Sequence, residues 1–271
     1  MRPITLQAQY YQQFDADLTR AVPGEGYGGW QSAPLTLDLE HTAMVVMHAW
    51  ETGRPEQYPG WHRAVEYMPR AQAILDDIMP GLLAAVRASG MTLFHVVGGG
   101  DYYRDYPGYQ RAAALAGPSP ATARVAADPS LTELRRFRAC NVFVGEHNRG
   151  DVDRGFAALD FAANARPLGG EGIAEDGPQL TALCQEAGVN HLIYTGFAIN
   201  WCLLMSPGGM VDMSRAGVMC SVLRQAVTAV ENRESARNEA HKAEALWRVA
   251  LAFGFVFDVD DFVTQLNRLS S

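Results

Sequence analysis

The chain has 271 residues, of which 48% are hydrophobic and 19% charged, with a formal net charge of -8. This length permits one large α/β domain with an ample core, and the composition is ordinary for a soluble globular protein. The acidic balance argues against nucleic-acid binding, because a phosphate-binding surface needs clustered Lys and Arg.

The N-terminal stretch "MRPITLQAQYYQQF" lacks the basic-then-apolar pattern of a signal peptide, and no apolar run approaches 18 residues. We therefore expect a soluble, cytoplasmic protein that makes no membrane contact. The four cysteines are scattered, without a CxxC pair or zinc spacing, so reduced thiols are expected in that compartment.

The first half of the chain predicts an arm followed by alternating strands and helices. Residues 1–37 are polar, dotted with aromatic residues and rich in Gly and Pro, which indicates an arm with little regular structure. We expect it to lie on the domain or on a neighbouring subunit. The apolar runs 42–50 and 91–100 predict buried strands, and the spacing in 68–90 predicts a helix ending at a glycine cap.

The second half continues the alternation. Residues 109–137 mix helical pieces with turn residues. After them we expect a short strand over residues 141–146 and a helix over residues 179–188. Two strands follow over residues 189–197 and 216–223, and residues 234–269 predict a helix, a short strand and a closing helix. Strands alternating with helices predict a three-layer α/β/α fold with a mostly parallel central sheet. We expect one domain over residues 38–271, preceded by the arm over residues 1–37.

Three strand ends carry residues suited to chemistry, and ligands of such sheets gather at the carboxyl ends of the strands. His48 follows the first buried strand, Asp101 follows the second, and Cys202 lies in the loop after "HLIYTG". A thiol at the start of a helix is a good nucleophile, because the helix N-terminus favours the thiolate. The alternatives are a buried structural thiol at Cys202 and a hydrogen-bonded structural histidine at His48.

Three motifs, in order, resemble the isochorismatase-like cysteine hydrolases: "TAMVVMHAWE" at the first strand, "TGFAINWC" at the nucleophile loop, and the closing helix, strand and helix. The resemblance covers roughly residues 38 to 268. It implies a Cys–Asp–Lys triad that attacks amide or related C–N bonds of small molecules, and it implies a homo-oligomer. Residue by residue, it places the nucleophile on Cys202, a cis peptide at Phe197–Ala198, and the oxyanion hole on the N–H groups of Ala198 and Cys202.

The other two triad members depart from this pattern. His48 stands where the family has its Asp, no lysine precedes residues 173–190, and Arg166 is the nearest cation. A histidine base needs no lysine to hold it ionised, so a Cys202–His48 pair would be self-consistent. Arg166 is either a third catalytic residue or an arginine that pairs with a carboxylate at the surface. The segment "LLMSPGGMVDMSRAG" after Cys202 is longer than usual, and Pro207 breaks its helical spacing.

We expect no catalytic metal and no cofactor, because Asp101 and Tyr103 stand where an Asp-x-His zinc motif would be. Trp50, Asp101, Tyr103 and Trp201 are the expected substrate-binding residues, with ordinary packing as the alternative for the aromatic ones.

The sequence therefore predicts a divergent cysteine hydrolase acting on a C–N bond of a small-molecule substrate. One alternative is a non-catalytic relative that binds a ligand or serves assembly, and another is a non-hydrolytic reaction of the same Cys–His pair.

Overall fold

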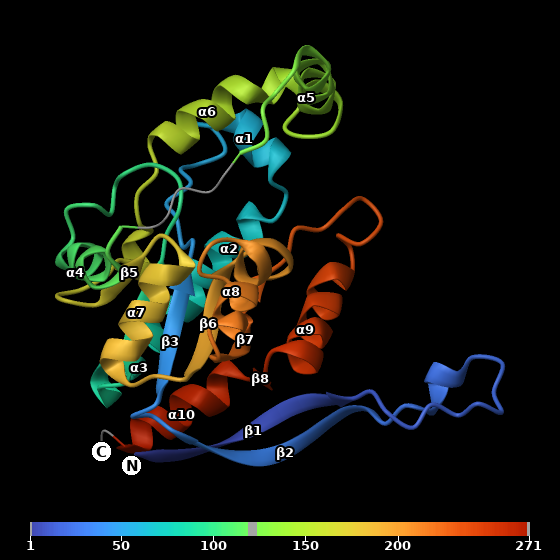
Figure 1. The fold of residues 1–271 in the computed structure, drawn as a ribbon, viewed down its shortest axis with the longest axis vertical. Coiled ribbons are helices and arrows are strands. Elements are labelled where there is room, and N and C mark those ends of the chain that lie inside the picture. The colour runs from blue at the N-terminus through green and yellow to red at the C-terminus, as the bar shows by residue number, and fades with distance from the viewer. Residues whose placement is uncertain (1, 119–123, 270–271) are drawn as a thin grey trace.

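The computed structural model describes residues 2–118 and 124–269, and in this part of the chain eight strands form one sheet (Figure 1). Its order is β2-β1-β8-β7-β6-β3-β4-β5. All pairs from β8 to β5 are parallel, whereas β1 is antiparallel to both β2 and β8. The strands are β1 (Pro3–Gln12), β2 (Gly29–Asp38), β3 (Thr42–Met47), β4 (Thr92–Val96), β5 (Gly172–Ala174), β6 (His191–Phe197), β7 (Met219–Thr228) and β8 (Val256–Phe257).

Helices cover both faces of this sheet, which gives the predicted three-layer α/β/α architecture. One face packs against α2 (Met68–Ala73), the π-helical η2 (Ile74–Ile78), α3 (Met79–Ser89) and α10 (Val259–Leu269). The other face packs against α4 (Pro107–Ala116), α7 (Gly177–Ala187), α8 (Met210–Arg215) and α9 (Ala240–Ala252). None of the helices in residues 2–118 and 124–269 has the length and apolar character needed to cross a membrane.

The two strands expected at the centre of the sheet are neighbours. Every residue of β3 and β6 is buried, and the strands pair in parallel from Thr42 opposite His191 to Met47 opposite Gly196. Strands buried on both faces read as continuous apolar runs rather than as alternating ones. The prediction that the strand ending at Thr195 lies inside a parallel sheet, near the strand ending at Met47, is therefore confirmed.

The Thr195-Gly196 pair is explained by this pairing. The Thr195 hydroxyl donates a hydrogen bond of 2.9 Å to the Val45 carbonyl. Gly196 has φ +107, and a Cβ there would lie 2.0 Å from the Met47 carbonyl oxygen. Only glycine allows β6 to approach β3 so closely at its carboxyl end.

Two elements differ from the expectation. The predicted helix over residues 68–90 is divided into α2, η2 and α3, with Pro80 in the first turn of α3 and Gly90 as its left-handed cap. The strand expected over residues 141–146 is wrong. α5 (Pro129–Asn141) ends there, and a loop leads to the 3-10 turn η3 (Glu146–Asn148) and α6 (Arg149–Ala157). The β-formers of "NVFVGE" are mostly exposed because no strand lies beside them.

The arm is a regular β-hairpin, so the expectation of little regular structure is wrong. Ile4, Leu6 and Ala8 are buried on one side of β1, and this alternation is the signal of a half-buried strand. The base of the hairpin thus belongs to the core of the domain. Its tip, residues 14–28, projects from the body and contains no buried residue (Figure 1). The 3-10 turn η1 (Pro23–Gly26) lies within this tip.

β2 is an outer strand of the sheet, and Pro34 lies in its middle, opposite Gln7 of β1. The Gln7 N–H donates to the Asp261 carboxylate on α10. The Gln7 N–H therefore points away from β2, so Gln7 and Pro34 are a pair that exchanges no backbone hydrogen bonds. In such a pair both backbone nitrogens point outward, and the Pro34 nitrogen faces the open side of β2.

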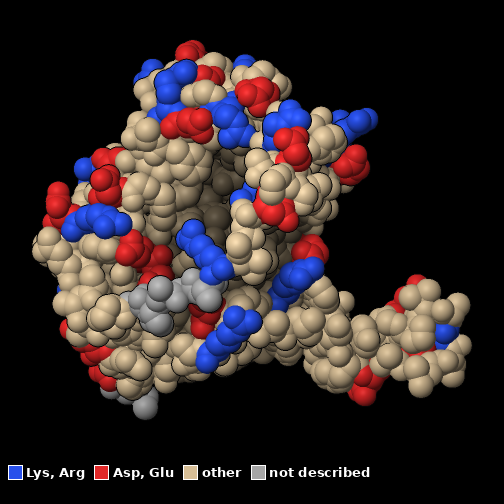
Figure 2. Space-filling view, turned by 45° about the horizontal axis from the view of Figure 1, so that its top comes forward, with Lys and Arg blue, Asp and Glu red and all other residues tan. Residues whose placement is uncertain are grey.

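A cap of α1 (Pro59–Ala64), α5 and α6 lies beyond the carboxyl ends of the parallel strands (Figure 1). Trp61 of α1 and Val152 of α6 are buried in a small apolar cluster that joins the cap to the body. Figure 2 shows a hollow on this side of the molecule, between the cap and the body, with Lys or Arg side chains along its rim.

Candidate functional site

The carboxyl ends of five parallel strands meet below the cap, and each is followed by polar or reactive residues. His48 follows β3, residues 98–101 follow β4, Glu175 follows β5, residues 198–202 follow β6, and residues 229–231 follow β7. β3 and β6 are adjacent, so the segments with His48 and Cys202 leave the sheet from neighbouring strands. This edge is the candidate site.

Cys202 lies in the π-helical turn η5 (Ile199–Leu203), a kind of turn that is frequent at functional sites. Its side chain is half-buried and packs against the core cluster on the α9 side of the sheet. Asn200 fixes the turn to the end of β7, because its amide donates to the Val230 carbonyl and accepts from the Val230 N–H, both at 2.8 Å. The peptide bond between Phe197 and Ala198 is cis, where the motif resemblance placed one.

His48 is buried in a left-handed backbone conformation, with φ +51. Its ring stacks on Trp50 at a centroid distance of 4.6 Å, and its Nδ1 has no hydrogen-bond partner. Burial lowers the pKa of His48 to about 4, and a hydrogen bond to the Val97 backbone opposes this shift. The imidazole is therefore neutral at pH 7, and its unpartnered Nδ1 is buried. A non-glycine residue with positive φ is costly, and such strain is common at functional sites.

The predicted substrate-binding residues fall into two groups. Trp50 belongs to the surroundings of His48, because its indole N–H donates to the Tyr102 hydroxyl at 2.8 Å. Trp201 is 55% exposed beside Cys202. Asp101 is exposed in the loop after β4, and its carbonyl accepts from the Arg104 N–H.

Tyr103 is buried, and its hydroxyl donates to the Glu175 carboxylate at 2.7 Å. Burial, followed by the neighbouring Glu175, raises the pKa of Tyr103 to about 12. Its place is thus fixed by a residue that follows β5, which the sequence reasoning did not single out. Within the described residues, no three His, Cys, Asp or Glu side chains are grouped to hold a metal ion.

Arg166 is engaged with its own segment of the chain. Its guanidinium lies 2.6 Å from the Asp160 carboxylate and 3.5 Å from the Phe161 carbonyl, to which it also donates. Both members of this ion pair are about half exposed. The contacts fit the carboxylate-pairing alternative for Arg166.

The start of α2 supplies residues that sequence reasoning missed. Burial raises the pKa of Tyr67 well above its usual value, and the nearby charge of Cys202 adds to this effect. Tyr67 is therefore a neutral phenol within electrostatic reach of the Cys202 thiol. Arg70, one turn later, donates to the Thr228 hydroxyl at 3.1 Å and forms ion pairs with Glu66 and Glu239 at 2.8 and 3.0 Å. The apolar spacing predicted that a helix begins here, and Pro69 lies in its first turn, where proline is favoured.

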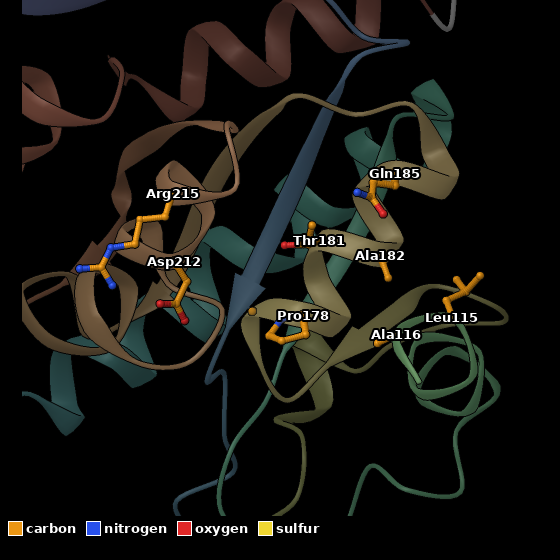
Figure 3. A pocket seen from close by; sticks show the side chains of 9 residues that line it. Leu115, Ala116, Pro178, Thr181, Ala182, Gln185, Asp212 and Arg215 are labelled. Atoms are coloured by element: carbon orange, nitrogen blue, oxygen red, sulfur yellow. The ribbon is translucent and has the colours of Figure 1, made fainter. Parts of the chain in front are cut away.

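Two surface hollows lie near this edge. One, of about 450 Å³, borders η5 on its outer side and is lined by Asn200, Trp201, Leu204, Met205, Val230, Glu231, Asn232, His241, Glu244 and Arg248. The other, of about 490 Å³, lies between α4, α7 and α8 and includes Thr181, Asp212 and Arg215 (Figure 3). Only the first contains residues of the nucleophile loop.

No protein-family model matches the sequence, and no curated protein matches it. Solved structures do match the fold. A cysteine hydrolase from Pseudomonas syringae pv. phaseolicola is 12% identical, with a TM-score of 0.48 over 86% of this chain and 95% of that one. An isochorismatase-like hydrolase from Alkaliphilus metalliredigens is 14% identical, with a TM-score of 0.47 over 84% and 98%.

N-carbamoylsarcosine amidase from Thermoplasma acidophilum is 14% identical, with a TM-score of 0.43 over 81% of this chain and 97% of that one. By name, these three proteins to which the chain is similar are a cysteine hydrolase, an isochorismatase-like hydrolase and an amidase.

Proposed function

We propose that the protein is a divergent cysteine hydrolase that cleaves a C–N, amide-type bond of a small molecule, with Cys202 as nucleophile and His48 as base. One observation carries the proposal: Cys202 and His48 follow two adjacent, fully buried parallel strands and so belong to the same sheet edge. His48 is neutral at pH 7, which is the form that a general base requires, but the burial that lowers its pKa also weakens it as a proton acceptor.

The chemistry would proceed in two halves. Neutral His48 takes the Cys202 thiol proton, and the thiolate attacks the carbonyl carbon of the substrate. The N–H groups of Ala198 and Cys202 stabilise the oxyanion. The C–N bond then breaks, the amine leaves with the proton held by His48, and a thioester remains on Cys202. Water, deprotonated by His48, hydrolyses the thioester and restores the thiol.

The second candidate function is a non-catalytic relative that binds a ligand or serves assembly. Two observations favour it. The contacts of the His48 ring that the structure records in residues 2–118 and 124–269 are with Trp50, Val97 and Gly98 rather than with the Cys202 sulfur. In addition, η5 ends at Leu203, and the chain turns through Pro207 before α8 begins at Met210. The helix after the nucleophile is thus interrupted, as the longer loop predicted.

Alkylation by iodoacetamide, followed residue by residue with mass spectrometry, separates the two functions. Cys140 is an exposed cysteine of the same chain and serves as the internal reference. A hydrogen bond to Glu146 raises the pKa of its thiol, so N-acetylcysteine serves as a second reference, against which the same advantage of Cys202 is required. For an enzyme, we expect Cys202 to react at pH 7 at least about tenfold faster than Cys140, and His48→Ala to remove this advantage. His48→Asp should not restore it, because no lysine precedes residues 173–190, where the resemblance places the lysine that holds the carboxylate ionised.

A panel of small amides then tests turnover by release of ammonia or amine. Cys202→Ser should abolish it, and the matched Cys140→Ser variant should leave it unchanged. If Cys202 reacts no faster than Cys140 and no amide is cleaved, the non-catalytic function is the correct one.

A further inference from the structure

The tip of the hairpin, residues 14–28, is a folded knob without support from the body. The Asp17 carboxylate accepts hydrogen bonds from the Thr19 N–H at 3.1 Å and the Arg20 Nε at 3.0 Å. The Asp17 N–H donates to the Pro23 carbonyl across the loop at 3.0 Å. The knob therefore holds its own shape, although no residue in it is buried.

The surface of the knob is both apolar and acidic. Leu18 is 84% exposed, and Phe14 and Val22 are exposed beside it in sequence. The knob carries three carboxylates, on Asp15, Asp17 and Glu25, against the single arginine Arg20. Large apolar side chains on a projecting, ordered segment indicate a contact that the isolated chain does not make.

Helix α5 in the cap has the complementary character. None of its residues is buried, and Leu134 and Phe137 are each 67% exposed. It carries three arginines, Arg135, Arg136 and Arg138, against the single Glu133. This basic helix is a local exception in a chain whose net charge is -8.

The knob and α5 lie far apart in one molecule, because the knob projects beside the base of the sheet and α5 lies at the outer end of the cap (Figure 1). We propose that the knob of one copy of this chain docks on α5 of a second copy. Leu18, Phe14 and Val22 cover Leu134 and Phe137, while the carboxylates of the knob face the arginines of α5. Such a contact buries a small area, so we expect a weak association that depends on protein concentration and salt.

Disulfide trapping tests the contact directly, because α5 has a native exposed cysteine, Cys140, one turn after Phe137. In the full-length Leu18→Cys variant, mild oxidation should give a covalent dimer that peptide mapping assigns to a 18–140 crosslink. The wild-type chain and Leu18→Cys/Cys140→Ser should not give this crosslink. If its yield in Leu18→Cys is no higher than that of a Cys140–Cys140 crosslink in the wild-type chain, the proposal is overturned.

Sedimentation of two surface variants tests the pairing of unlike surfaces. Leu18→Ser removes the exposed leucine of the knob without adding a charge, and Phe137→Asp removes the exposed phenylalanine of α5. Both positions are exposed, so the fold should persist. We expect each variant alone to associate at least about tenfold more weakly than the wild type. An equal mixture should recover heterodimers, because intact knobs then meet intact α5 helices. The proposal would be contradicted if the wild-type chain stayed monomeric at high concentration. It would also be contradicted if both variants associated as strongly as the wild type.

Discussion

His48 and His191 are buried neutral histidines, and their burial makes stability depend on pH. Burial lowers the pKa of each to about 4, against an ordinary value of 6.5. Between these values the unfolded chain binds protons that the folded chain does not. The free energy of unfolding therefore decreases as the pH falls from 6.5 towards 4, by up to about 3 kcal/mol for each histidine, and is unaffected by them above 6.5.

We expect urea unfolding, measured from pH 4.5 to 7.5, to show this loss on the acid side. His191→Gln should flatten the dependence, because it removes a group that binds a proton in the unfolded chain only, and His48→Gln/His191→Gln should flatten it further. Buried His95, whose pKa burial also lowers, is common to all the variants. Comparing variants cancels the contribution of carboxylates common to all of them. An identical pH dependence in the wild type and the double variant would show that these histidines are accessible to protons in the folded state.

Gly196 is the point at which β6 and β3 approach too closely for any side chain. We expect Gly196→Ala to destabilise the protein by more than about 3 kcal/mol, or to prevent folding, because a Cβ 2.0 Å from the Met47 carbonyl oxygen would separate the strands. Gly188→Ala is the matched control. Gly188 also has positive φ, but nothing lies within 4 Å of its Cβ position, so a cost of about 1 kcal/mol is expected. If thermal unfolding showed equal losses of stability for the two variants, the positive φ alone, and not the close approach of the strands, would explain the cost of an alanine.

The central strands could be predicted because β3 and β6 are buried on both faces, so their apolar runs needed no knowledge of partners. The same rule of strand ends located His48 and Cys202. Tyr67 and Arg70 could not be found in this way, because they lie at the start of a helix, and its place near Cys202 and Thr228 depends on tertiary packing. In the hairpin, the Gly and Pro residues of the tip concealed the alternation of Ile4, Leu6 and Ala8.

The base of the hairpin is part of the folding unit, whereas its knob is not. We expect Leu6→Ala to lower the free energy of unfolding by about 2–5 kcal/mol, because Leu6 is 1% exposed within the main apolar cluster. Leu18→Ala, in the same arm but 84% exposed, should change it by less than about 0.5 kcal/mol in dilute solution. Urea unfolding at low protein concentration measures both. A negligible effect of Leu6→Ala would mean that the arm is a separate appendage.

Pro34 hinders the pairing of an additional strand with the open side of β2. Its nitrogen faces the open side of β2, so an additional strand laid there would meet no N–H group at its centre. The opposite border is β5, which offers only three residues to an incoming strand. Both borders therefore resist the edge-to-edge joining by which sheets grow into fibrils. A chain with an exposed ten-residue strand is in this way protected from templated aggregation, and the self-association that we propose would use side-chain surfaces instead of strand edges.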